Sequence, residues 1–290
     1  MNLNKLKLYT LSEIFQLVKI SIGSRLIASA PKGLRKTNEL VDTLLAAGTK
    51  VESHNDSINF SYAINEQSFQ FQLKRNSSDA LVFQQIILYK EYKCIVDFFM
   101  NNNISLNHII DAGANIGMTS IYLKAFFPKA KIIALEPSDN TYHRLENNIK
   151  KNNFSDVTCL QKGLWSHKTF LSPDTSFRDK LDWSFKLVET KHNENGAIEV
   201  LAVGDMMKDY QLDGIDFLKI DIEGGETAVF GETADLSWLH NVKVIAIEIH
   251  DEFNCRPEIE GKLKDFGFSL SYTGELTIGI NNKLLNLKQV

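Results

Sequence analysis

The chain has 290 residues, of which 43% are hydrophobic and 23% are charged. This composition is typical of a globular protein and excludes a disordered one, and 16 glycines with only 5 prolines argue against long linkers. The net charge of −4 gives the chain no overall basic character, so we expect no nucleic-acid partner.

The three cysteines, Cys94, Cys159 and Cys255, lie far apart and form no CxxC pair. This pattern predicts neither a disulfide framework nor a zinc site and is typical of a reducing compartment; Cys94 and Cys159 have the apolar neighbours of buried thiols. The sequence contains no apolar stretch of about 20 residues, so we expect neither a signal peptide nor a transmembrane span. The expected location is therefore cytoplasmic.

The N-terminal end is basic, whereas the remainder is acidic. Residues 1–36 carry seven basic side chains and one acidic one, a net charge of +6 that leaves −10 for the rest. Apolar side chains in residues 8–26 follow helical spacing: Leu8, Leu11, Phe15, Val18, Ile22 and Leu26. Such a stripe packs on the protein's own body, forms a homodimer seam or lies on a membrane surface, so a peripheral membrane or partner docking role stays open.

Two further patterns precede the main domain. A helix is expected over 37–48 with Thr37 as its N-cap. Residues 58–73 alternate between apolar and polar side chains around Asn65-Glu66, which predicts a hairpin. We therefore expect residues 1–76 to form a small N-terminal α+β accessory domain.

Residues 77–290 are expected to form the main domain, which opens with a helix over 77–102 capped by Ser78 or Asp79. Strands are then expected at 108–112, 131–135, 157–162, 215–221 and 242–250, and helices at 117–127, 139–152, 225–231 and 256–266. Final strands at 268–273 and 276–280 meet in a tight turn. This alternation predicts an α/β fold: a Rossmann-like, doubly wound, mostly parallel sheet with a C-terminal antiparallel hairpin.

An insertion at about 163–204 interrupts this alternation. It holds five large aromatic residues among many polar ones: Trp165, Phe170, Phe177, Trp183 and Phe185. These side chains either form a wall or lid over an acceptor or belong to the core.

The first strand of the alternation ends in a glycine-rich turn that leads into a helix, an arrangement that places ligands at a helix N-terminus. A dinucleotide-binding fingerprint is absent, because Asn115 and Met118 stand where glycines would follow Gly113, and no phosphate-binding Gly-Lys-Ser/Thr follows. The remaining pattern runs from Asp111 through Gly113 to Gly117. An acid at its start favours a cofactor that carries a positive amino group.

Glu136 ends the second strand, 19 residues after Gly117. An acid at this position can accept hydrogen bonds from both hydroxyls of a ribose. A nucleoside with a cationic amino-acid tail and no phosphates is S-adenosylmethionine, which we expect as the cofactor. Alternatively, Glu136 only caps the helix that starts near Ser138.

Three stretches carry a resemblance to a known family: IIDAGANIGMTS, ALEPSDNTYHRLENNIKKN and DFLKIDIEGGE. They resemble the FkbM-type methyltransferases, a branch of the class I S-adenosylmethionine-dependent family, and the similarity covers roughly 77–250. The resemblance implies a seven-stranded sheet. It places the methionine part of the cofactor at Asp111, Gly113, Asn115 and Gly117, the ribose at Glu136, and the adenine near Gly163 and Trp165.

The block FLKIDIEGGE places three acids within six positions, where like charges repel. We expect Asp221, at the strand tip beside the cofactor loop, to offset the sulfonium charge or bind the amino group. Glu223 is expected to act in catalysis. Glu226 falls in the first turn of a helix, where the helix dipole favours a carboxylate by about 0.3–1 kcal/mol.

The next strand ends with Glu248 and His250, two positions apart and so on one face. His250 is a candidate base for an acceptor hydroxyl, and the alternative is a structural histidine at a strand end. Together with Asp221 and Glu223, these side chains could also ligate Mg²⁺, although we expect no metal.

The sequence therefore predicts an S-adenosylmethionine-dependent O-methyltransferase that acts on a hydroxyl of a small-molecule or glycan acceptor. The expected acceptor is a sugar or a secondary metabolite. The catalytic candidates are His250, Glu223 and Asp221. The alternative is a non-catalytic sensor or scaffold that binds a nucleotide cofactor.

Overall fold

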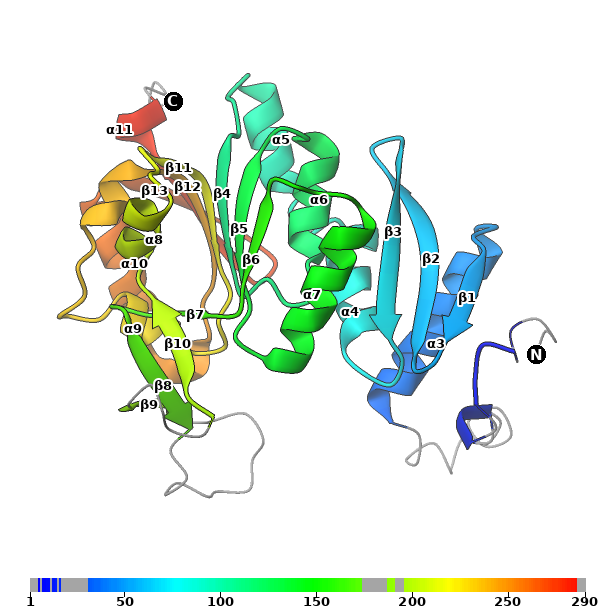
Figure 1. The fold of residues 1–290 in the computed structure, drawn as a ribbon. Helices are drawn as coiled ribbons and strands as arrows, with labels where there is room; N and C mark the ends of the chain where they lie inside the picture. Colours follow the sequence, from blue (N-terminus) through cyan, green and yellow to red (C-terminus); the bar gives the residue numbers. More distant parts are fainter. Residues whose placement is uncertain are drawn as a thin grey trace. The chain divides into compact units, whose positions relative to one another are not determined.

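The computed structural model describes residues 5, 7–10, 12–14, 16, 31–173, 187–190 and 196–285. The chain divides into two compact units (Figure 1). One unit comprises residues 1–97, 116–128 and 143–154, and the other comprises 98–115, 129–142 and 155–290. Within the described parts, no helix combines the length and apolar character that crossing a membrane requires. The domain boundary expected at residue 76 stays a prediction.

The first unit holds a three-stranded antiparallel sheet in the order β1 (Val51–His54), β2 (Ser57–Ile64) and β3 (Gln67–Lys74). The hairpin between β2 and β3 turns at Asn65 and Glu66, whose φ angles of 48° and 62° are those of a tight hairpin turn. The hairpin expected over 58–73 is confirmed, whereas β1 has no counterpart in the sequence prediction.

Two helix predictions for this unit need correction. Helix α3 runs over Lys32–Ala46, so Thr37 is not its N-cap; the Thr37 hydroxyl instead donates to the Gly33 carbonyl at 2.9 Å. The single helix expected over 77–102 is three pieces: α4 (Asp79–Phe83), the π-helix η2 (Gln84–Leu88) and α5 (Lys93–Asn101). Lys90, with φ of 57°, breaks the run.

The capping predictions at the start of α4 also fail. Ser78 makes no side-chain cap, and Asp79 lies inside the helix. The buried Asp79 carboxylate accepts the Lys74 backbone N–H at 2.8 Å, and Arg144 Nε lies 3.2 Å from it. Asp79 therefore joins β3 to α4 and pairs with a residue of α7 (Asp139–Lys151).

The second unit is built on a seven-stranded sheet (Figure 1). Its order is β13 (Phe268–Thr273), β14 (Leu276–Asn281), β12 (Val242–Glu248), β11 (Ile215–Ile220), β4 (His108–Ala112), β5 (Lys131–Leu135) and β6 (Val157–Leu160). The strands from β12 to β6 pair in parallel, and β14 and β13 add an antiparallel hairpin. The predicted fold class is confirmed.

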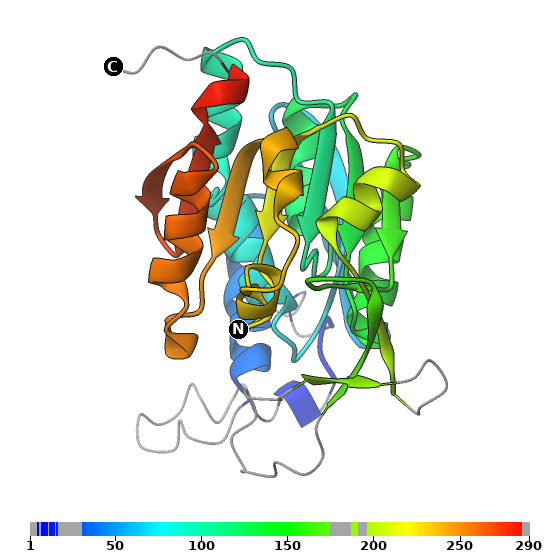
Figure 2. The same ribbon diagram turned by 90° about the vertical axis from the view of Figure 1, so that its left-hand side faces the viewer.

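Helices on one face of this sheet complete its core. In Figure 2, α8 (Val203–Asp209) and α10 (Arg256–Asp265) lie in front of the strands. Buried side chains from the sheet, from these helices, from α9 (Glu226–Val229) and from the 3-10 helix η3 (Ser237–Asn241) form one hydrophobic cluster. The second unit also contains the 3-10 helix η4 (Asp251–Phe253) and α11 (Asn282–Leu285), whereas α6 (Met118–Phe126) belongs to the first unit.

A second, four-stranded sheet occupies the region expected as an insertion. Its order is β7 (Gly163–Leu164), β10 (Ile198–Leu201), β8 (Thr169–Pro173) and β9 (Leu187–Thr190). Of the aromatic residues singled out there, Phe177, Trp183 and Phe185 lie outside the described residues.

The described residues settle two smaller expectations. Of the N-terminal stripe, Leu8 is described and buried, and Leu11, Phe15, Val18, Ile22 and Leu26 lie outside the described residues. None of the three cysteines is in a disulfide. Cys255 is buried, whereas Cys94 and Cys159 are half-buried, so the expectation of two buried thiols is wrong.

Candidate active site

The parallel strands of the second unit end at a pocket that encloses about 700 Å³, open solvent included. β4 lies between β11 and β5, and the chain continues from β4 to β5. The gap between β4 and β11 is therefore the topological switch point, where ligands bind in such sheets. Four charged side chains line the pocket: Glu136, Lys162, Asp221 and Glu223. An apolar wall faces them, made of Leu164, Trp165, Leu171, Ile198 and Val200.

The turn after β4 is pressed against the end of β11. A Cβ at Gly113, whose φ is 78°, would lie 1.7 Å from the Asp221 carbonyl oxygen, so only glycine fits. The Asp221 N–H donates to the Ala112 carbonyl at 3.1 Å, which fixes the two segments to each other. Gly113 and Asp221, both predicted site residues, therefore meet at the pocket wall.

Glu136 lines the same pocket and also holds two backbone segments. Its carboxylate accepts the N–H of Asn115 at 3.1 Å and the N–H of Ser138 at 2.9 Å. A carboxylate oxygen can accept more than one hydrogen bond, so holding these two backbone segments does not by itself exclude a ligand. The two interpretations of Glu136, a ribose acceptor and a cap, are compatible in this geometry. Asn115, with φ of 49°, contacts Glu136 through its backbone.

Gly117 begins α6 in the first unit. Its φ is 86°, and a Cβ there would lie 2.8 Å from a methyl group of Leu145 on α7. This close approach explains the glycine by helix packing. Gly117 is not among the residues that line the pocket.

Asp111 is completely buried and faces a lysine that the sequence analysis did not single out. Lys219 Nζ lies 3.3 Å from Asp111 Oδ1 and 3.3 Å from Asp221 Oδ2, and it donates to the Gly113 carbonyl at 2.6 Å. Asp221 rather than Asp111 lines the pocket. A lysine inside the fully buried strand β11 was the available signal, because a buried charge needs a partner.

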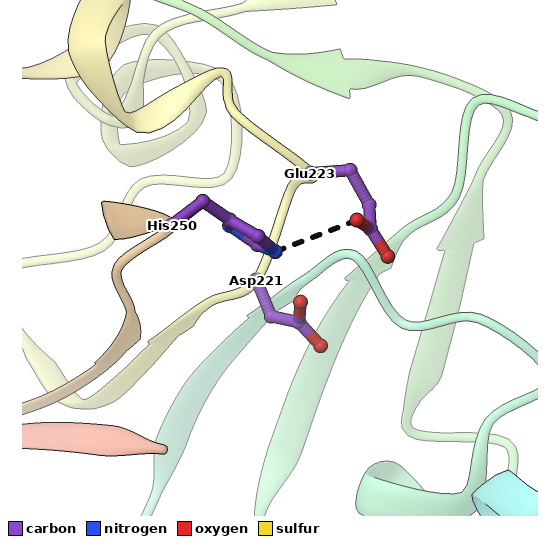
Figure 3. Close-up of side chains that lie close together, drawn as sticks. All are labelled: Asp221, Glu223 and His250. Carbon is purple, nitrogen blue, oxygen red and sulfur yellow. Dashed lines mark ion pairs between the residues drawn. The ribbon is translucent and has the colours of Figure 1, made fainter. Parts of the chain in front are cut away.

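Asp221, Glu223 and His250 come together at the mouth of β11 and β12 (Figure 3). His250 Nε2 lies 3.4 Å from a carboxylate oxygen of Glu223, and one ligand atom from each of the three lies within 4.8 Å of the others. Oxygen and imidazole donors at this spacing could hold a divalent ion. Glu248, the fourth side chain considered from the sequence, is not part of this group.

Glu226 lies behind His250 and is completely buried. Its Oε1 accepts the Ile222 N–H at 3.2 Å and lies 3.2 Å from His250 Nδ1. Burial raises the pKa of the Glu226 carboxyl, and nearby hydrogen bonds and His250 only partly offset this. The sequence analysis attributed Glu226 to the dipole of a helix, but α9 has only four residues. The contact with His250, which the sequence analysis missed, is therefore more informative than the helix position.

The pKa of His250 reflects two opposing causes. Burial alone would lower it, but the carboxylates of Glu226 and Glu223, with a smaller effect from Glu248, raise it above its ordinary value. His250 is thus a half-buried imidazole surrounded by negative charge.

Gly163 and Trp165 lie where the adenine is expected. A Cβ at Gly163 would lie 3.0 Å from a methyl group of Val200, and the Trp165 backbone N–H donates to Leu201 at 2.9 Å. Both residues line the pocket beside its apolar wall. A pocket with this wall, with Glu136 and with Asp221 offers the surfaces that an adenine, a ribose and a cationic amino-acid tail require, so its donor set fits S-adenosylmethionine.

Comparison with known proteins gives a consistent family. The model of the methyltransferase FkbM domain matches residues 111–270. Methyltransferase sdnD of Sordaria araneosa is 32% identical over 215 residues, covering 63% of this chain and 82% of that protein. The 31-O-demethyl-FK506 methyltransferase FkbM of Streptomyces tacrolimicus is 24% identical over 189 residues, covering 56% of this chain and 72% of that protein.

Among solved structures, a putative caffeoyl-CoA O-methyltransferase from Staphylococcus aureus covers 97% of this chain and 100% of its own at 10% identity, with a TM-score of 0.40. This likeness is too low to carry an argument. The family match covers more than half of the chain, and it includes the glycine turn, Glu136 and the acidic block. The chain therefore belongs to the FkbM methyltransferase family and is a methyltransferase that uses S-adenosylmethionine.

Proposed function

We propose that the chain transfers a methyl group to a hydroxyl oxygen of a small molecule, either a sugar or a secondary metabolite. The observation that carries the proposal is the position of His250, whose Nε2 lies 3.4 Å from Glu223. A hydroxyl is a weak nucleophile until it loses its proton, so a base beside the methyl-transfer pocket suits an oxygen acceptor. The name of the Streptomyces relative also refers to an O-demethyl substrate.

The residues that would hold the cofactor follow from the pocket lining. Glu136 would accept hydrogen bonds from the ribose hydroxyls, and the wall at Gly163 and Trp165 would cover the adenine. Asp221 would bind the amino group or offset the sulfonium charge. Asn115 and Gly117 would shape the turn beside Gly113, and Asp111 would act through its ion pair with Lys219. The bound cofactor supplies a methyl group activated by its sulfonium.

The remaining groups would act on the acceptor. His250 Nε2 would take the proton of the acceptor hydroxyl, and Glu223 would hold the hydroxyl or stabilise the protonated ring. Glu223 is 79% exposed at its side chain, so it can reach an acceptor that enters from solvent. Holding the two reactants in line would be the larger contribution.

The test is a transfer assay with S-adenosylmethionine carrying an isotopically labelled methyl group. The purified protein is incubated with pools of hydroxylated metabolites and oligosaccharides, and labelled products are located by mass spectrometry and NMR. We expect label on an oxygen. Label on nitrogen or carbon would refute the oxygen acceptor, and cofactor binding without transfer to any pool would favour a sensor or scaffold.

A further inference from the structure

We infer that Glu226 is a positioning residue for His250: its buried carboxylate holds the ring in the Nδ1–H tautomer and leaves Nε2 free to accept a proton. The catalytic meaning of this inference rests on the proposed function. The tautomer itself is a property of the resting protein and can be measured without any acceptor.

The position of Glu226 is built into the turn after β11. The chain turns through Glu223 and Gly224, whose φ angles of 52° and 91° are left-handed, and then enters α9 with Glu226 as its first residue. Its side chain is 0% exposed, a placement that is costly for a carboxyl group unless partners compensate. Its Oε1 is partnered by the Ile222 N–H and the ring of His250, whereas the buried Oε2 has no hydrogen-bond partner among the described residues.

The hydrogen-bond directions determine the tautomer. Glu226 Oε1 accepts the Ile222 N–H, so this oxygen is an acceptor. His250 Nδ1 lies 3.2 Å from the same oxygen, and an ionised Glu226 can only accept a hydrogen bond, so opposite the ionised carboxylate Nδ1 carries the hydrogen. In a neutral imidazole the other nitrogen is then a lone-pair acceptor. That nitrogen is Nε2, whose contact with the 79% exposed Glu223 side chain is longer, at 3.4 Å, than the contact of Nδ1 with Glu226.

Negative charge surrounds the ring from several elements. Glu226 lies on α9, Glu223 on the turn after β11 and Glu248 at the end of β12, and a carboxylate oxygen of Asp221 lies within 4.8 Å of a ring nitrogen. These carboxylates favour the imidazolium that forms when Nε2 accepts a proton. A base oriented by a buried acid is the arrangement that general-base catalysis requires.

The first experiment measures the tautomer in the free protein. In ¹⁵N-labelled protein, long-range ¹H–¹⁵N spectra at a pH where His250 is neutral should show a protonated Nδ1 and an unprotonated Nε2. Glu226→Gln keeps a side-chain oxygen acceptor and should retain this tautomer, whereas Glu226→Ala should give a mixture. An Nε2–H tautomer in the wild-type protein would overturn the inference, whatever the reaction proves to be.

The second experiment separates positioning from stability. Glu226→Gln removes the charge that favours imidazolium, so kcat should fall by up to about 100-fold, a typical contribution of general-base catalysis. The KM for S-adenosylmethionine should stay within about twofold. The pKa of His250 should fall, so the acidic limb of the kcat profile should move to lower pH.

Asp216→Asn is the matched control. Asp216 is a buried carboxylate at the start of β11 that accepts the N–H groups of Asn107 and His108 at 2.7 and 2.9 Å. Its loss should lower the melting temperature without moving the acidic limb. Glu226 is merely structural if Glu226→Gln leaves the acidic limb of the kcat profile in place. In that case its kcat should fall only as far as its lower melting temperature explains, as in the Asp216→Asn control. If no acceptor is ever found, the tautomer measurement still decides the inference.

Discussion

Lys219 and Asp111 form a buried ion pair at the centre of the sheet, with Nζ 3.3 Å from Oδ1 and side-chain exposures of 3% and 0%. The same ammonium group lies 3.3 Å from Asp221 and donates to the Gly113 carbonyl. One cation therefore joins two adjacent strands to the turn that opens the pocket. Asp111 needs this charge, because a buried carboxylate without a cation is strongly unfavourable.

Replacing this lysine by an apolar residue of similar length should destabilise the protein. Lys219→Met leaves Asp111 buried without its cation, and we expect a loss of about 3–5 kcal/mol in the free energy of unfolding by urea denaturation. The control is Lys264→Met, which removes an exposed lysine that lies 3.9 Å from Glu260 and should cost less than about 1 kcal/mol. Equal losses in the two variants would contradict the structural role of Lys219.

Gly113 should tolerate no side chain. Gly113→Ala adds a Cβ 1.7 Å from the Asp221 carbonyl oxygen, so the turn must move away from β11. Gly48→Ala isolates the conformational part of the cost, because Gly48 has a similar φ of 76° and nothing within 4 Å of its Cβ. The control should lose about 1–2 kcal/mol of stability. Gly113→Ala should lose more and bind S-adenosylmethionine more weakly by calorimetry; matching effects would mean that the close approach is unimportant.

The sequence predicted several strands of the large sheet accurately, since each is a short apolar run with a clear turn signal. β4, β5 and β13 have the expected bounds. It failed at 77–102, because apolar spacing continues past Lys90 and no glycine or proline marks the break there. It also missed the functions of Lys219 and Glu226. A sequence shows that a charge lies in an apolar strand, but its partner, here Asp111, lies 108 positions away.

Glu136 should contribute to cofactor affinity beyond its backbone contacts. Glu136→Ala removes the acceptors proposed for the ribose hydroxyls, so we expect binding of S-adenosylmethionine to weaken by about 1.5–3 kcal/mol in calorimetry. Asp235→Ala is a control for capping alone, because Asp235 accepts the Ser237 N–H at 2.9 Å on the surface. That variant should bind normally. If Glu136→Ala also binds S-adenosylmethionine normally, Glu136 only caps the backbone and does not contribute to cofactor affinity.

Chelation should leave turnover unchanged. The carboxylates of Asp221 and Glu223 lie with His250 at a spacing that could hold a divalent ion, yet the proposed mechanism uses His250 as a base with a free Nε2. We therefore expect dialysis against EDTA to leave kcat within about twofold, with the melting temperature as a control for protein integrity. A loss that Mg²⁺ or Mn²⁺ restores would replace the base mechanism by a metal-assisted one.

The charged surroundings of His250 should also appear in the pH dependence of stability. The pKa of His250 is raised in the folded protein: burial opposes the shift, but the Glu226 and Glu223 carboxylates outweigh it. A group of this kind contributes stability that is fully present below its unfolded pKa of about 6.5 and is lost as the pH rises through its folded pKa. The melting temperature of His250→Gln should therefore fall furthest below that of the wild type at pH 5 to 6, and the difference should shrink as the pH rises. A difference that grows with pH would mean that burial outweighs the carboxylates at His250.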